Sequence, residues 1–407
     1  MHNPRHSQPT TTSIQTPSPT NRPNPTADPD FAFTLRAEPV ATAPSDPIAD
    51  ARRTATRLTT SITDIVIAAG PPQWRSLHIS TSVTTTTITA DAIFTAADNR
   101  AVQVEIPTEA IELIQVLRLA TIDLRTYPWW YAAIERDNSA MTTYDFGYGE
   151  HPFPPERLLP AAAYRADLAV YPRERLPVWL AAHLAVDNGW RVGSTLAAAR
   201  ADPAAVATAV RFLEPTTLFA RWSVLAAAAV TVGSEWGPRI LGSSAVFEAT
   251  DGGGATLSLL PRGRAVLSGG LWNARELDDA YHSGHAMPRF FAGAPDWLDL
   301  SVLNPRALTG EMSFCYWWDG SGWACGQSPD PTTIGPAIPG MWTPRTVVDI
   351  VCAVLGPTAI RSAVATLVEA AEFGTVTREI GRAAFDTTPD AETDTAWGQL
   401  ALAGVTL

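Results

Sequence analysis

The chain has 407 residues, of which 46% are hydrophobic and 17% are charged, and its formal net charge at pH 7 is −12. This length allows roughly two to four ordinary domains with a large core. An acidic surface disfavours nucleic-acid binding, because such binding needs Lys and Arg to displace counterions from phosphates. It favours basic protein partners and fast electrostatic association with them.

Cysteine usage and hydropathy give a first expectation about location. The three cysteines (Cys315, Cys325 and Cys352) form no CxxC motif, and neither a disulfide framework nor a zinc knuckle is indicated. The N-terminal sequence MHNPRHSQPTTT has no apolar stretch typical of a secretory signal. The longest apolar runs are too short to cross a bilayer. We therefore expect a reduced, cytoplasmic protein with no membrane segment.

The chain divides by composition into four regions. Residues 1–50 are rich in Pro, Thr, Ser, Asn and Asp and lack periodic apolar positions, which predicts a disordered tail. A first α+β unit is expected over 51–187, a helical linker over 188–215, and a second, diverged α+β unit with C-terminal helices over 216–407. The predicted fold class is α+β, with two tandem units that each pack an antiparallel sheet against helices.

Apolar periodicity places the elements of the first unit. Leu58, Ile62, Ile65 and Val66 share one helical face, and Gly70-Pro71-Pro72 ends that helix. In the segment AVQVEI, at 101–106, apolar and polar residues alternate as in a half-buried strand. Pro107 then opens the main helix of the unit. The complete expectation is helix at 54–69, strands at 74–82, 83–97 and 101–106, helix from 107, hairpin strands at 129–136 and 140–146, and further helix at 154–172 and 176–186.

The second unit repeats this plan in outline. VGSEWGPRILGSS at 232–244 parallels AAGPPQWRSLHIS at 68–80, and residues 294–320 parallel residues 127–149. The first pair shares a Gly followed by a Trp and strand-like residues. The second pair shares Pro, Trp, a strand, a turn and an aromatic strand that ends on Gly. Together they suggest a tandem duplication with a period of about 165 residues. Expected elements are helix at 219–232, strands at 245–250, 255–261 and 264–267, helix at 275–286, and C-terminal helices at 344–354, 357–373 and 376–384.

Candidate catalytic and metal-binding groups each have a simpler explanation. His282 and His285 have metal-ligand spacing, but Ser283-Gly284 interrupts the helix that would align them. Glu109 and Glu112 share a helix face, which is by default a solvated face rather than an acid–base pair. The DGGG segment at 251–254 lacks a P-loop lysine and fits a hairpin turn. We expect no metal, no cofactor and no enzymatic activity, although an enzyme of unknown type stays open.

Two aromatic clusters are the strongest remaining feature. The first is YPWWY at 127–131 together with YDFGY at 144–148, and the second is FCYWWDGSGW at 314–323. Alternate aromatic residues on a strand point to both faces of a sheet. One face can be core, whereas the other needs either a covering element or a partner. Helices that cover both faces are an equally weighted alternative.

The order of short motifs in the first unit resembles the YezG-like immunity proteins of bacterial polymorphic toxin systems. These motifs are Trp74 before a strand, Ile106-Pro107 at the start of the main helix, Leu117-Arg118 within it, Pro128-Trp129 after it, and Tyr144-Asp145 on a later strand. The similarity covers about residues 54–185, and Phe146 stands where the family has a second Tyr.

All 29 basic residues are Arg, which indicates a high-GC genome such as that of an actinobacterium.

This resemblance implies a protein that binds and blocks a cognate toxin domain of basic surface, such as a nuclease. Acidic side chains would occupy the phosphate-binding cleft of the toxin and aromatic side chains would anchor the contact. The expected partner-binding residues are Glu105, Glu109, Glu112, Tyr144, Asp145, Phe146, Tyr148, Glu150, Tyr316, Trp318, Asp319 and Trp323. The alternative is a carbohydrate-binding or cell-envelope-associated module that uses a Trp-rich surface.

Overall fold

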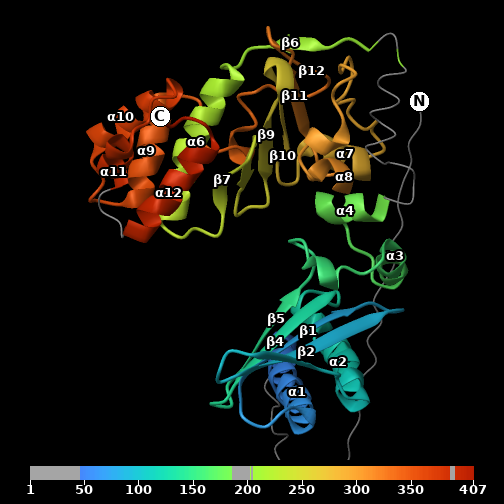
Figure 1. Cartoon of the computed structure of the whole chain (residues 1–407). Helices are drawn as coiled ribbons and strands as arrows, with labels where there is room; N and C mark the ends of the chain where they lie inside the picture. Colours follow the sequence, from blue (N-terminus) through green and yellow to red (C-terminus); the bar gives the residue numbers. More distant parts are fainter. Residues whose placement is uncertain (1–45, 186–201, 203–204, 386–389) are drawn as a thin grey trace, which may run out of the picture. The chain divides into compact units, whose positions relative to one another are not determined.

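The computed structural model describes residues 46–185, 202, 205–385 and 390–407, without the side chains of residues 390–393. The stretch from Asp46 to Leu407 forms one compact unit. It contains helices and two antiparallel sheets, one of five strands and one of seven, and the predicted α+β class is confirmed (Figure 1). Most of the predicted tail lies outside the described residues.

The first sheet has the strand order β3-β2-β1-β4-β5, and β3 and β5 are therefore its edges. Its central strand β1 pairs antiparallel with both β2 and β4. Side chains alternate between the two faces of each strand. The strands are β1 (Trp74–Val83), β2 (Ile88–Ala96), β3 (Ala101–Val104), β4 (Tyr131–Asp137) and β5 (Thr142–Gly147).

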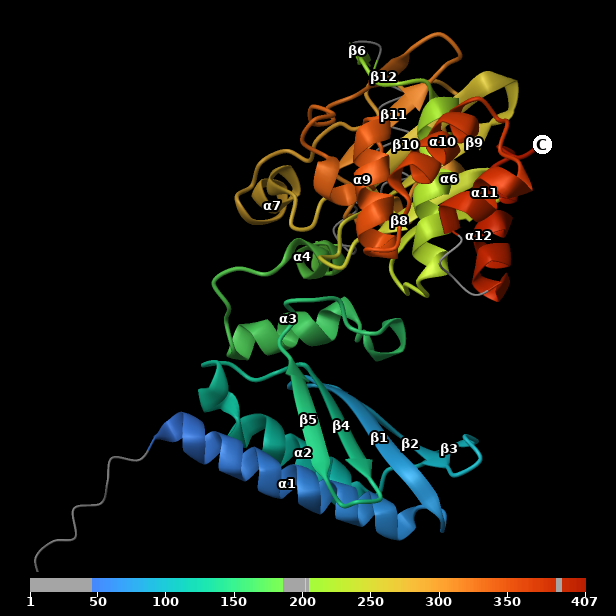
Figure 2. The ribbon, with the colours of Figure 1, turned by 90° about the vertical axis from the view of Figure 1, so that its left-hand side faces the viewer.

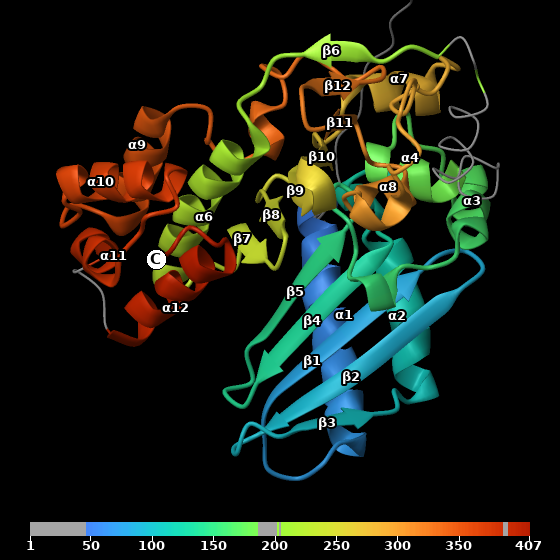
Figure 3. The same cartoon turned by 45° about the horizontal axis from the view of Figure 1, so that its top comes forward.

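Helices α1 (Pro47–Ala69) and α2 (Thr108–Ala120) lie side by side on one face of this sheet, and the strands stand in front of them in Figure 3. The side chain of Asp46 caps α1 by accepting hydrogen bonds from the N–H groups of Ile48 and Ala49. The helices bury their apolar stripes against Leu77, Ile79, Phe94 and Ile134. Helices α1 and α2 therefore cover one face of the sheet, and the opposite face is covered at the Ser82 end of β1, where the short helix Pro155–Arg157 packs on it.

A second apolar cluster closes one end of the first sheet. Helices α3 (Ala161–Val170) and α4 (Val178–Ala185) follow β5, and Figure 2 shows α3 across the ends of β4 and β5. The rings of Trp130, Tyr164 and Trp179 pack there with Phe153. Pro-rich connections separate these short helices, in agreement with the helical segments that the sequence predicts.

The second sheet is a meander with one added edge strand, in the order β6-β12-β11-β10-β9-β8-β7. Each consecutive pair from β7 to β12 is antiparallel. The strands are β6 (Thr208–Val210), β7 (Gly237–Leu241), β8 (Ser244–Glu248), β9 (Gly254–Leu260), β10 (Arg264–Gly270), β11 (Phe314–Trp318) and β12 (Trp323–Cys325).

Helices cover both faces of the second sheet. One apolar cluster joins Leu257, Leu267 and Tyr316 to the helices α6 (Pro215–Thr231), α9 (Pro344–Leu355), α10 (Arg361–Glu372), α11 (Arg378–Phe385) and α12 (Asp390–Leu402). Another joins Val266, Cys315 and Trp317 to α7 (Arg275–His282) and α8 (Arg306–Thr309). Helix α4 also packs against α7 and α8. The sheet is therefore buried on both sides.

Two predictions about organisation are wrong. A tandem duplication would repeat the strand order, whereas β1 is central in the first sheet and its expected counterpart β7 is an edge strand of the second. The predicted helical linker over 188–215 contains β6, which pairs with β12 and so belongs to the second sheet. The rest of that linker up to residue 204, residue 202 excepted, lies outside the described residues.

Candidate functional site

The side chains of the YDFGY segment at 144–148, in the first aromatic cluster, are split between the two faces of the first sheet. Asp145 is exposed and lies opposite Ala133, whereas Tyr144 and Phe146 lie opposite the buried residues Ile134 and Ala132. The ring of Phe146 stacks on Trp129 at 5.2 Å on the helix-covered side. Strand alternation therefore directs the acid and the neighbouring rings in opposite directions, and Tyr144 and Phe146 contribute to the core rather than anchor a partner.

Three further predicted anchors are buried. Tyr148 is 7% exposed, Tyr316 is 0% exposed and Trp323 is 3% exposed. Burial raises the pKa of Tyr148 to about 12. Trp318 is half-buried against Trp323, with their ring centroids 5.8 Å apart. Tyr148, Tyr316 and Trp323 therefore cannot be surface anchors, because Tyr148 belongs to the core between the first sheet and its helices, and Tyr316 and Trp323 belong to the core of the second sheet.

Asp319 and Glu150, two of the predicted acids, are exposed and have local partners. Asp319 accepts hydrogen bonds from the N–H of Ser321 at 2.8 Å and of Gly322 at 3.1 Å, which shapes the β11–β12 turn. These bonds, that from the Ser321 N–H foremost, lower the pKa of the Asp319 carboxyl. Glu150 lies 3.7 Å from Arg125 in an exposed ion pair. Each of these two carboxylates therefore has a local structural partner.

The remaining predicted acids separate into two groups. Glu109 and Glu112 are exposed on α2, on the helix side of the first sheet. Glu105 directly follows β3, is exposed, and by strand alternation lies on the side of Gln103, the face that α1 and α2 do not cover. Asp145 lies on the same face, at the other edge. The predicted single acidic rim therefore does not exist, but Glu105 and Asp145 delimit one surface.

We call that surface the open face: the side of the first sheet opposite α1 and α2. It carries mainly small and polar side chains, and its acids come from four neighbouring strands or their ends. His78 Nδ1 lies 3.3 Å from Glu135 Oε1, and both side chains are largely solvent-exposed. Gln103 donates a hydrogen bond of 2.9 Å to Asp91, which also pairs with Arg157. Residues of the open face are Ser76, His78, Ser80, Asp91, Ile93, Gln103, Glu105, Ala133, Glu135, Thr143 and Asp145.

The open face is shallowly hollowed at the end of the sheet that carries the β4–β5 hairpin. A depression of about 230 Å³ is lined there by residues that include Ser76, His78, Glu135, Met141 and Thr143. Ile93 is 39% exposed beside His78 and supplies an apolar contact point. Sequence reasoning missed this surface because the strand order, and thus the neighbours of β1, is not encoded in local periodicity. The alternation of β1 itself was visible in the sequence.

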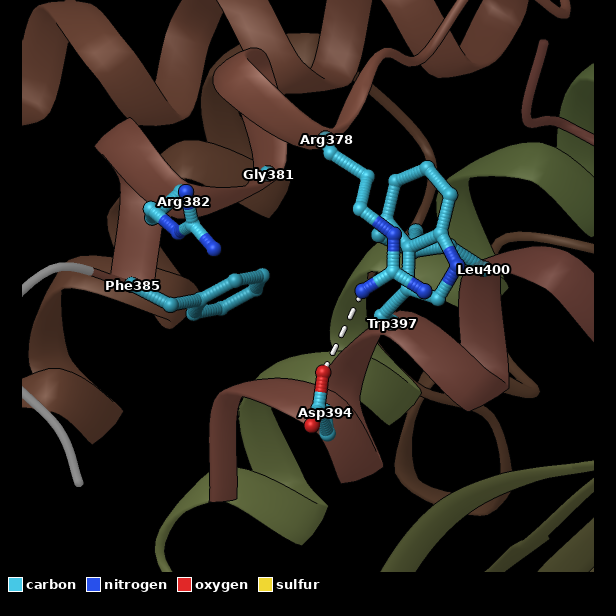
Figure 4. A pocket seen from close by; sticks show the side chains of 7 residues that line it. All are labelled: Arg378, Gly381, Arg382, Phe385, Asp394, Trp397 and Leu400. Atoms are coloured by element: carbon cyan, nitrogen blue, oxygen red, sulfur yellow. Dashed lines mark hydrogen bonds and ion pairs between the residues drawn. The ribbon is translucent and has the colours of Figure 1, made fainter. Parts of the chain in front are cut away.

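A separate pocket of about 270 Å³ lies between α11 and α12 (Figure 4). Arg378 donates a hydrogen bond of 3.2 Å to Asp394, and its guanidinium lies 4.8 Å from the ring centre of Trp397. These contacts join the two helices. We assign this pocket no function.

His282 and His285, which have metal-ligand spacing in the sequence, do not lie on one helix. Helix α7 ends at His282, and His285 is exposed beyond it. His282 Nδ1 lies 2.9 Å from Asp278, which also pairs with Arg175. Within the described part of the chain, no three His, Cys, Asp or Glu side chains are placed to share a metal ion.

Comparisons with known proteins add no assignment. No protein-family model matches this chain. A search of curated proteins finds no relative. Among the described helices, none has both the length and the apolar character needed to span a bilayer.

Proposed function

We propose that this chain is a non-catalytic, cytoplasmic immunity factor that binds a cognate toxin domain of basic surface and occludes its active cleft. The observation that carries the proposal is the open face, where Glu135 and Asp145 present exposed carboxylates without a covering helix. The net charge of −12 also favours a partner with a basic surface. The motif order shared with YezG-like proteins supports the immunity role.

The acidic open face is a better match for a nucleic-acid-binding protein as partner than for a nucleic acid. Carboxylates repel phosphates, whereas the cleft of a nuclease presents the Lys and Arg side chains that bind phosphates. Complementary electrostatic potentials of this kind guide the two proteins toward each other and fix their relative orientation in the complex. The exposed Ile93 and the small residues Ser80 and Ala133 allow close approach of a partner backbone or side chain.

Paired charge reversals test which surface binds. The change Glu135→Lys with Asp145→Lys places two positive charges on the open face, and the matched control Glu109→Lys with Glu112→Lys places two on α2. With the toxin domain encoded beside this gene, we expect the first pair to weaken binding by about tenfold or more for each reversed charge. The control should bind within about twofold of the wild type, measured by calorimetry.

Cross-linking provides an independent map of the same contact. The chain contains no lysine. A carbodiimide therefore joins lysine amines of the partner to carboxylates of this chain, without competition from lysines of this sequence. Cross-links at Glu105, Glu135 or Asp145 support the proposal. Cross-links confined to α2, equal loss of binding in both paired variants, or failure to protect a toxin-expressing host would each count against it.

A further inference from the structure

A second candidate site lies at the end of the seven-stranded sheet, where β8 ends and β9 begins. A hollow of about 540 Å³ opens there, and it is independent of the open face. The DGGG segment forms the β8–β9 turn, as the sequence predicts, with Gly253 N–H donating to Asp251 Oδ1 at 2.9 Å. The walls of the hollow include Trp236, Glu248, Trp272, Arg306 and Glu311.

Glycines allow these walls to approach the backbone. A Cβ atom on Gly252 would lie 2.5 Å from the ring of Trp272, and one on Gly254 would lie 2.7 Å from Glu248 Oε2. A Cβ atom on Gly270 would lie 2.3 Å from the carbonyl oxygen of Glu311. No side chain larger than hydrogen fits at these positions without displacement of a wall. The hollow is thus tightly built by the turn and the end of β10.

The charges of the hollow do not cancel. Arg306 donates to Glu248 through two hydrogen bonds of 2.9 Å and 2.6 Å, and it donates a third to the carbonyl oxygen of Gly252 at 2.8 Å. These bonds pair the positive charge of the Arg306 guanidinium with the Glu248 carboxylate in a bidentate geometry. Glu311 is the second carboxylate, and with both acids ionised the lining carries −2 + 1 = −1. Burial raises the pKa of the Glu311 carboxyl, and hydrogen bonding with Thr309 and the charge of Arg306 oppose this effect.

The aromatic walls provide the second half of a cation site. Trp236 is 55% exposed. Trp272 stacks against His151 with ring centres 5.7 Å apart. The guanidinium–ring contacts found within the described chain involve other rings, namely those of Tyr127, Trp130, Tyr148, Tyr171, Trp297 and Trp397. The indoles of Trp236 and Trp272 therefore have no such cation over them within that part of the chain.

We infer that this hollow binds an ammonium or guanidinium group carried on an apolar stem, as in the side chain of lysine or arginine. Indole faces attract cations, and the partly buried carboxylate of Glu311, which forms no ion pair with the described residues, completes the recognition. An anion would face Glu311 and an arginine that is already paired. A neutral sugar could stack on the same indoles but would gain no charge pairing from Glu311.

Binding is tested with two matched probes on the full chain labelled with 5-fluorotryptophan. Nα-acetyl-L-lysine amide carries the cation, and Nα-acetyl-L-norleucine amide is its neutral counterpart. The changes Trp236→Phe and Trp272→Phe assign the two fluorine resonances among the 14 tryptophans. We expect the lysine probe to shift both resonances saturably and the norleucine probe to leave them in place. Equal shifts with both probes would overturn the inference.

Variants locate the cation. Glu311→Gln should lower the affinity for the lysine probe by about tenfold or more, since a lost hydrogen bond to a charged group is worth roughly 1.5–3 kcal/mol. Glu276→Gln, which alters an exposed glutamate on α7, should leave affinity unchanged. If Glu311→Gln does not fold, Trp236→Leu removes an exposed wall and should weaken the probe severalfold. Unchanged affinity in the folded Glu311 variant, or in Trp236→Leu, contradicts the inference.

A third probe distinguishes the source of the cation. Free L-lysine carries an α-ammonium and a carboxylate that the blocked probe lacks. Equal affinity for free and blocked lysine indicates a side chain presented by a protein. Tighter binding of free lysine, by about tenfold or more, indicates a free amino acid or amine as the ligand; both results support a cation site.

Discussion

Arg118 and Asp167 show how one residue pair joins several elements of the first sheet. Arg118 Nη2 donates to both carboxylate oxygens of Asp167, at 2.8 Å and 2.7 Å, and its Nε donates to the carbonyl oxygen of Trp129. Asp167 also accepts from Trp130 Nε1 at 2.6 Å and from the N–H of Thr85 at 2.8 Å. Both side chains are at most 4% exposed. The Leu-Arg motif of the sequence therefore has a structural role.

Removal of one partner of this pair should be costly. Asp167→Ala leaves the Arg118 guanidinium buried without its counter-charge, and burial already lowers the pKa of Arg118. We expect the change to lower the free energy of unfolding by about 3–5 kcal/mol. Asp123→Ala, at an exposed acid beyond α2, should change it by less than about 0.5 kcal/mol. Denaturant titration of both variants measures this, and similar midpoints would show that the network contributes little.

At the scale of elements, periodicity predicts most helices and strands but not their neighbours. The alternation at 101–106 predicts β3, and Thr343-Pro344 predicts the start of α9, where Thr343 Oγ1 accepts from the N–H of Thr346 at 3.0 Å. The three-residue strand β6 was missed, because its only signal is pairing with β12 more than 100 residues later. The candidate surfaces could be predicted only in part, since exposure of an aromatic strand depends on which helices cover it.

The β8–β9 turn gives a prediction at this scale. In Gly254→Ala the new methyl group would lie 2.6 Å from the carbonyl oxygen of Phe247 and 2.8 Å from Arg306 Nη1. Because backbone lies on one side and a bidentate ion pair on the other, we expect a loss of about 1–3 kcal/mol in unfolding free energy. The control Gly322→Ala has no neighbour within 4 Å of its new Cβ and should be nearly neutral. Equal unfolding temperatures for the two variants would contradict the described packing of the turn.

At the scale of the whole molecule, the acidic charge should act on the rate of association more than on the lifetime of the complex. A net charge of −12 creates a long-range potential that attracts a basic partner, and the exposed carboxylates of the open face orient it at close range. Salt screens this potential, with a Debye length that falls from about 10 Å at 0.1 M to about 3 Å at 1 M. Contacts made by Ile93 and by partly buried groups are screened much less.

We therefore expect the association rate constant with the proposed basic toxin domain to fall by about tenfold or more between 0.05 M and 0.5 M NaCl, while the dissociation rate constant changes by less than about threefold. Stopped-flow mixing under pseudo-first-order conditions separates the two constants. The open-face variant Glu135→Lys with Asp145→Lys should show a much flatter salt dependence, because it reverses charges that steer the encounter. The α2 variant Glu109→Lys with Glu112→Lys changes the net charge by the same amount. If both variants flatten the salt dependence equally, overall charge rather than the open face governs recognition, and the proposed docking surface is wrong.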